Sequence, residues 1–171
     1  MKLGFTLKEL FYLVIVLFGI GLVVLFGIEY YSEKVAYSNA VHELRQMQTA
    51  VYAYQEDNKD SYPVEVSNAL PSGLDAYLRA VPVDGEWPSG PFPGSYYDWD
   101  DWSPDDLMHP PFEHVRQISI RFCSIDGSEC FFPNEEWAAG FDQYSAVYLC
   151  LEGPCRAHAS QPVTHPGIRV N

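Results

Sequence analysis

The sequence contains no proline before Pro63 and no charged side chain between Leu10 and Ile28. Without a proline, nothing breaks a helix in this first part of the chain. Extended back to Phe5, the uncharged run makes a helix roughly 36 Å long, at about 1.5 Å per residue. Because the hydrocarbon core of a bilayer is about 30 Å thick, residues 5–28 are predicted to span a membrane. No small-residue cleavage site follows near Ile28, which argues against a removable secretory signal.

Basic residues are also scarce. The chain has 10 lysines and arginines against 23 aspartates and glutamates, so its net charge is −13. Such an acidic chain repels polyphosphates, so no general binding of nucleic acid is expected. Lys2 and Lys8 precede the uncharged run, and positive charge marks the cytoplasmic end of a membrane span. The sequence therefore predicts a single pass through the cytoplasmic (inner) membrane, with the part after Ile28 exported.

Signatures of catalysis are missing as well. The sequence has no HExxH, no G-x-S-x-G and no glycine-rich phosphate loop. His109 and His114 stand on either side of two prolines, a spacing that fits loop histidines better than a helical metal pair. We therefore expect a protein that is not an enzyme.

Cysteines are few, and all four lie in the part predicted to be exported, which favours disulfides over free thiols. Cys123 and Cys130 flank a predicted hairpin, and Cys150 and Cys155 close a short turn, so local pairing is favoured. Pairing of Cys123 with Cys150 is the main rival, and the sequence leaves three connectivities open. The spacing does not favour a zinc site. Each local bond would stabilise the fold by about 2–3 kcal/mol.

Residues 29–58 change from uniformly apolar to amphipathic. Apolar side chains recur there at three- and four-residue steps, at Tyr37, Ala40, Val41, Leu44, Met47, Val51 and Tyr54. The polar run at 57–60, followed by Pro63, marks the end of the helix. One continuous helix of about 50 residues is predicted, with a membrane-spanning half and an amphipathic half.

The remaining residues, 59–171, are predicted to form an exported globular domain. A short helical turn fits residues 74–79, and alternating apolar residues predict strands at 118–122 and 144–150. Residues 82–111 hold seven prolines, no lysine or arginine and six large aromatic residues. We expect a long irregular loop there, pinned to the core by its rings. The predicted fold class is α+β, with one long helix packed on a small antiparallel sheet.

The same loop contains a dense acidic run. Five carboxylates are candidates for binding calcium, which prefers oxygen ligands: Asp98, Asp100, Asp101, Asp105 and Asp106. The run lacks the fixed ligand order of an EF-hand, so a solvated acidic edge with inward-turned rings is the favoured alternative.

Residues 4–10, GFTLKEL, carry the most specific signal. Thr6 and Glu9 fit a capping box, which alone would explain a carboxylate at the start of a membrane helix. The whole window, with its basic leader and long apolar continuation, resembles the cleavage and methylation region of type IV pilins and type II secretion pseudopilins. Two positions depart from that pattern: Lys8 stands where an apolar residue is usual, and Phe26 where a proline is common.

The resemblance implies a processed subunit that polymerises. A prepilin peptidase and N-methyltransferase would remove the leader, residues 1–4, by cutting after Gly4, and would methylate Phe5. The resemblance also implies a type IV pilin-like fold. The subunit would then form a homopolymeric helical filament through the helix at 5–28, with an inner-membrane assembly platform as partner. The filament would be extracellular or periplasmic.

Physical chemistry gives Glu9 a role in that assembly. A carboxylate in an apolar phase costs several kcal/mol unless it is paired. Cleavage would free an α-amine on Phe5, and the amine of a neighbouring copy would meet the Glu9 carboxylate. The rival interpretation is a monomeric exported binding or sensor domain held by one membrane helix. The net charge of −13 disfavours a third interpretation, a pilin that takes up DNA.

Overall fold

The computed structural model describes residues 6–66, 69–78, 86–124 and 127–171, apart from the side chains of 26, 29, 30 and 33. The chain divides into two compact units, one ending at Tyr37 and one formed by Ser38–Asn171. The predicted amphipathic half of the helix therefore belongs, from Ser38 onward, to the globular unit. The fold is α+β, as the sequence predicts.

Helix α1 runs without a break from Leu7 to Asp57, a length of 51 residues. This confirms the continuous helix expected from the absence of proline. The helix ends where the polar run begins, because Lys59 and Asp60 adopt positive φ angles of 58° and 63°. The amide of Asp60 donates back to the carbonyl of Gln55 at 3.0 Å, which closes the last turn.

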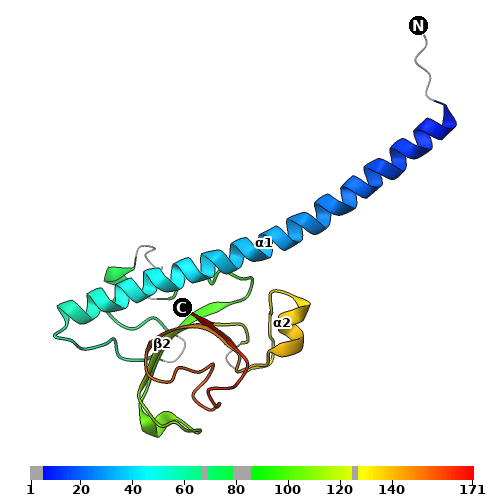
Figure 1. Ribbon diagram of the computed structural model, residues 1–171. Coiled ribbons are helices and arrows are strands. Elements are labelled where there is room, and N and C mark those ends of the chain that lie inside the picture. The colour runs from blue at the N-terminus through cyan, green and yellow to red at the C-terminus, as the bar shows by residue number, and fades with distance from the viewer. Residues whose placement is uncertain (1–5, 67–68, 79–85, 125–126) are drawn as a thin grey trace. The chain divides into compact units, whose positions relative to one another are not determined.

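The globular unit is built on one four-stranded sheet in the order β1-β2-β3-β4 (Figure 1). Its strands are β1 (Tyr96–Trp102), β2 (Val115–Arg121), β3 (Ala146–Glu152) and β4 (Ile168–Val170). The first three pair antiparallel, whereas β4 pairs parallel to β3. The sheet is therefore mixed, and the prediction of a purely antiparallel sheet was wrong. β4 has only three residues, too few to show a strand pattern in the sequence.

Strand β1 lies inside residues 82–111, so the prediction of an irregular loop there was wrong for residues 96–102. Prolines on both sides and the aspartates, which are poor strand formers, hid the alternation of buried rings with other side chains. The expectation that rings pin this segment is confirmed, since Tyr97 and Trp99 are fully buried. The predicted strands at 118–122 and 144–150 correspond to β2 and β3 within a few residues.

Residues 38–57 of α1 cover one face of the sheet. Five of their side chains are buried: Ala40, Leu44, Met47, Ala50 and Val51. All but Ala50 lie on the stripe expected from the sequence. From β1, the hydroxyl of Tyr97 donates to the carboxylate of Glu43 on the helix. The indole of Trp99 donates to the carbonyl of Pro63 at 2.9 Å, which ties the end of the helix to the same strand.

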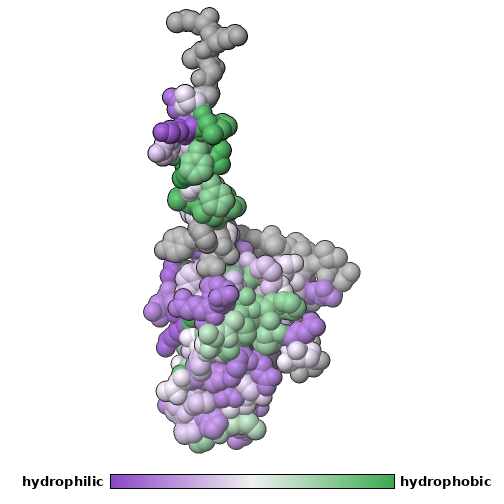
Figure 2. All heavy atoms as spheres, turned by 90° about the vertical axis from the view of Figure 1, so that its right-hand side faces the viewer, coloured by the Kyte–Doolittle hydropathy of each residue, from purple (hydrophilic) through white to green (hydrophobic). Residues whose placement is uncertain are grey.

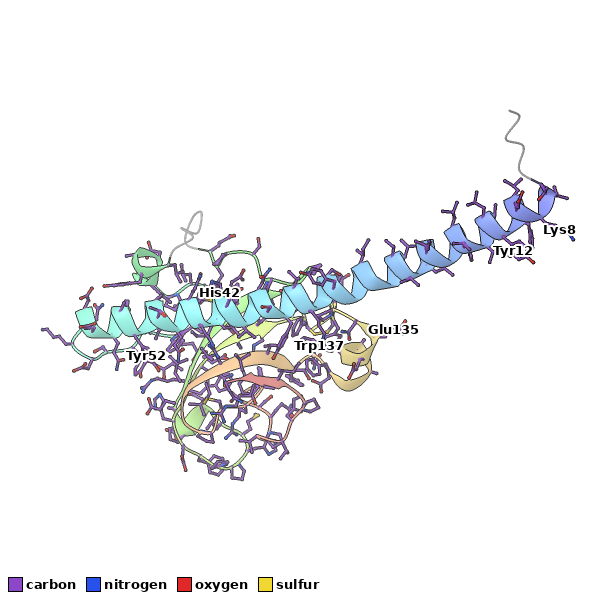
Figure 3. All side chains as sticks on the ribbon, turned by 45° about the horizontal axis from the view of Figure 1, so that its top comes forward. Lys8, Tyr12, His42, Tyr52, Glu135 and Trp137 are labelled. Carbon is purple, nitrogen blue, oxygen red and sulfur yellow. A yellow bond between two sulfur atoms is a disulfide. The ribbon has the colours of Figure 1, made fainter. Side chains whose placement is uncertain are left out.

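Short elements complete the globular unit: η1 (Leu74–Tyr77), η3 (Pro104–Asp106) and α2 (Glu135–Gly140). η1 occupies the predicted helical turn. Helix α2 is capped by Asn134, whose side chain accepts from the amide of Trp137 at 2.9 Å. Figure 3 shows Trp137 pointing from α2 toward the sheet, where its ring centroid lies 5.5 Å from that of Phe122. This aromatic cluster anchors the β2–β3 connection.

Candidate functional site

The first half of α1 is the most prominent candidate site. Residues Leu7–Leu25 have a mean hydropathy of 2.3, and none of this window is buried. Figure 2 shows hydrophobic side chains gathered along this helix. A core helix of a soluble domain of this length would be mostly buried, whereas Phe18 is 69% exposed and Val23 is 73% exposed. The segment is long and apolar enough to cross a membrane.

At the start of this helix, Thr6 and Glu9 form the capping box. The amide and the hydroxyl of Thr6 both donate to Oε2 of Glu9 at 2.8 Å, and the amide of Glu9 reaches the Thr6 hydroxyl at 3.4 Å. The Glu9 carboxylate thus accepts hydrogen bonds from donors at the start of its own helix. The other two predicted site residues, Gly4 and Phe5, lie outside the described residues.

Three glycines interrupt the apolar surface. A Cβ placed on Gly19, Gly21 or Gly27 would meet no atom within 4 Å. Around Gly27 the missing side chain leaves a shallow open groove, lined by Val24, Gly27, Ile28, Tyr31, Ser32 and Val35. Among the residues that the structure describes, nothing packs against these glycines, although glycine costs about 1 kcal/mol relative to alanine inside a helix.

The predicted calcium candidates do not converge. Asp98 lies 3.7 Å from Arg121, while Asp101 binds the ring of His114 at 2.6 Å. Asp106 accepts from Ser103 in a capping box, and Asp105 is exposed beside it in η3. Among the residues that the structure describes, no group of three or more His, Cys, Asp or Glu is placed to hold a metal ion.

Asp100, the fifth candidate, is only 1% exposed, which the expected solvated acidic edge does not explain. It is at the centre of a polar cluster on the sheet face opposite α1. Arg121 donates to it at 3.0 Å, Gln117 at 2.9 Å and Ser119 at 2.8 Å. Burial opposes the charge of Arg121, but the carboxylates of Asp100 and Asp98 outweigh it and raise the arginine pKa. These contacts neutralise Asp100 within the fold.

Sequence reasoning missed this cluster. The strand pattern at 118–122 places its polar residues opposite the buried isoleucines, and such a face is normally solvated. Here that face is covered by residues 153–167. One signal was present: in a chain with few basic residues, Arg121 stands in a predicted strand near the acidic run.

Glu65 is the titratable group that the fold perturbs most clearly near neutral pH. It lies beside strand β1 and accepts a hydrogen bond from the amide of Asp101 at 3.0 Å. Partial burial raises its pKa to about 7, the hydrogen bond from the Asp101 amide opposes that shift, and the nearby carboxylates of Asp100, Asp101 and Asp106 add to it.

The cysteines form two local disulfides, Cys123–Cys130 and Cys150–Cys155. This is the favoured pairing, and it excludes the rival bond between Cys123 and Cys150. The first bond closes the connection after β2, and the second closes the turn after β3. No thiol remains free among the described residues.

No family model, curated protein or solved structure matches this chain. The residues and their geometry therefore carry the functional assignment.

Proposed function

We propose that the chain is a structural subunit, a pilin or pseudopilin, of a type IV pilus-like or type II secretion-like filament. A prepilin peptidase would cut it after Gly4, and it would polymerise through the first half of α1. The observation that carries the proposal is the wholly unburied apolar helix, which begins with the carboxylate of Glu9.

An unburied apolar surface of this length needs either lipid or other helices around it. Each large apolar side chain gains about 1.5–3 kcal/mol when it leaves water. Lipid alone satisfies the apolar side chains, but it does not satisfy a charged carboxylate. The capping box occupies one oxygen of Glu9, and a cationic α-amine on Phe5 of a neighbouring copy would neutralise its charge.

The glycines favour packing between helices over a lone anchor. Small residues let two helix backbones approach closely, and membrane helices associate through such positions. Gly19, Gly21 and Gly27 have open space around them in the single chain. In a filament, side chains of adjoining helices would fill that space.

The rest of the fold is compatible with a pilin-like layout. One long helix has an apolar half and an amphipathic half, and the amphipathic half packs on a small sheet whose connections carry disulfides. In the filament, the acidic globular unit would face solvent outside the inner membrane. Partners would be further copies of the chain, the peptidase and N-methyltransferase, and an assembly platform.

The mature N-terminus tests the processing step. The full chain is produced together with a prepilin peptidase and its intact mass is measured, with a Gly4→Leu variant as the uncleaved control. We expect loss of residues 1–4 and methylation of Phe5. An intact Met1, or a cut near Ile28, would contradict the proposal and favour the monomeric membrane-anchored domain.

Assembly is tested separately with Glu9→Ala, and with Lys8→Ala as the neighbouring control. We expect Glu9→Ala to abolish sedimentable filaments while both disulfides and the folded unit persist. Lys8→Ala should still assemble. Filaments of Glu9→Ala at the normal level would remove the assembly role of this carboxylate.

A further inference from the structure

The connection between β1 and β2 exposes apolar side chains at its end. We call residues Met108–Phe112 the tip. Met108 is 72% exposed and Phe112 is 55% exposed, and the two prolines between them are also exposed. In Figure 1 this connection follows η3 at the end of the globular unit that lies away from residues 38–57 of α1. Exposed apolar side chains gathered on one loop mark an interaction site more often than isolated ones do.

A buried arginine fixes the backbone of the tip. Arg156 is 0% exposed, and its guanidinium donates to the carbonyl of His109 at 2.6 Å and of Pro111 at 2.8 Å. The amide of Met108 donates to the carbonyl of Ala159 at 3.2 Å. Both ends of the tip are thereby attached to residues 153–167, which cover this face of the sheet.

Attaching the tip in this way requires a buried guanidinium, which is costly in free energy. The guanidinium of Arg156 is satisfied by backbone carbonyls, and its Nε has no hydrogen-bond partner among the described residues. Burying a charged group in this way is unfavourable. What it produces is an exposed apolar segment that is ordered in advance, and advance ordering lowers the entropic cost of binding a partner.

The charges around the tip restrict the partner. Asp105, Asp106 and Glu113 are exposed beside it, and residues 104–113 contain no lysine or arginine. An acidic border repels anionic lipid and nucleic acid. The tip of a second copy carries the same acidic border, so contact between two tips is disfavoured for the same reason. We infer that the tip docks on a partner protein that presents an apolar surface bordered by lysine or arginine side chains.

The test uses the full chain in phosphatidylcholine nanodiscs and a fluorescent amphipathic peptide of leucine and lysine as the probe. A leucine–glutamate peptide and empty nanodiscs are the controls for charge and for lipid. The tip variant is Met108→Ser with Phe112→Ser. The matched control is Phe131→Ser, because Phe131 is also exposed, at 51%, but lies in the β2–β3 connection.

We expect the tip variant to lose affinity for the leucine–lysine peptide by about tenfold or more, as loss of a binding hot spot does. Phe131→Ser should bind as the unmodified chain does, and the leucine–glutamate peptide should bind neither. Equal affinities in the tip variant and the control would overturn the inference. So would tip-dependent self-association of the nanodiscs, or tip-dependent binding to vesicles of phosphatidylcholine and phosphatidylglycerol.

Arg156→Met tests the attachment of the tip backbone by a different measurement. Amide hydrogen exchange should rise in residues 107–113 while protection in β2 and β3 remains, and affinity for the leucine–lysine peptide should fall with it. If this variant does not fold, the tip variant and its control still decide the inference. Unchanged exchange in the tip of a folded variant would exclude the proposed positioning role of Arg156.

Discussion

Arg121 and Asp100 form a buried ion pair between neighbouring strands, with Nη2 of the arginine 3.0 Å from Oδ1 and 3.2 Å from Oδ2 of the aspartate. Nη1 of Arg121 also donates to the carbonyl of Ala157, in the segment that covers this face of the sheet. The pair therefore links β1, β2 and the covering layer. An acidic residue that the sequence suggested as a calcium ligand instead holds the globular unit together.

Asp100→Asn should strongly destabilise the globular unit. It leaves the guanidinium of Arg121 buried without its carboxylate, and breaking a buried pair from one side costs about 3–5 kcal/mol. All four tryptophans lie in the Ser38–Asn171 unit, so tryptophan fluorescence during urea unfolding reports its stability. Asp105→Asn is the control, since Asp105 is exposed, and it should change the free energy of unfolding by less than about 0.5 kcal/mol. Equal effects of the two variants would contradict the central role of Asp100.

Glu65 should make the stability of the globular unit depend on pH. Its pKa rises from 4.5 to about 7 on folding, so between these values the native state holds a proton that the unfolded state has released. Where the native state binds more protons, the free energy of unfolding falls as pH rises. The contribution of Glu65 is therefore favourable near pH 4.5 and is lost by about pH 7.

Glu65→Gln should flatten that dependence. The glutamine still accepts a hydrogen bond from the amide of Asp101 but carries no charge. Above pH 7 the variant should be more stable than the unmodified chain, by about 1 kcal/mol once the partial exposure of the site is allowed for. Urea unfolding at several pH values measures the difference. The same slope in both proteins between pH 4.5 and 7 would show that Glu65 does not titrate in this range.

Local patterns in the sequence predicted the elements that depend on local physics. The length of α1 follows from the absence of proline and from its apolar stripe, and the disulfides follow from cysteines that flank turns. β4 was missed because its parallel pairing with β3 depends on where residues 153–167 lead the chain. No local pattern carries that information.

The polar cluster around Asp100 is a second feature that local sequence patterns do not predict. Asp100 was recognised as chemically important, but its partner Arg121 lies 21 positions away, and the residues that cover the pair come later still. Whether a polar strand face is solvated or covered is decided by such distant segments. The sequence therefore indicated the residues of this cluster without indicating their arrangement.

The two disulfides should make similar contributions to stability. The bonded cysteines are 7 and 5 positions apart, and loops of this size stabilise by about 2–3 kcal/mol in the chain-entropy model. Cys150→Ser with Cys155→Ser, and Cys123→Ser with Cys130→Ser, should each lower the free energy of unfolding by about that amount. Non-reducing peptide mapping by mass spectrometry checks the pairing beforehand. A peptide that joins Cys123 to Cys150 would contradict it.

Leucines in the two halves of α1 should differ sharply in what they do for the globular unit. Leu44 is fully buried against the sheet, and replacing it by alanine should cost about 2–5 kcal/mol through lost burial and the cavity left behind. Leu13 is 45% exposed in the apolar half, so Leu13→Ala should leave the unfolding of the globular unit unchanged. Both variants are measured in nanodiscs by tryptophan fluorescence in urea. An equal loss of stability would mean that the apolar half also supports the globular unit.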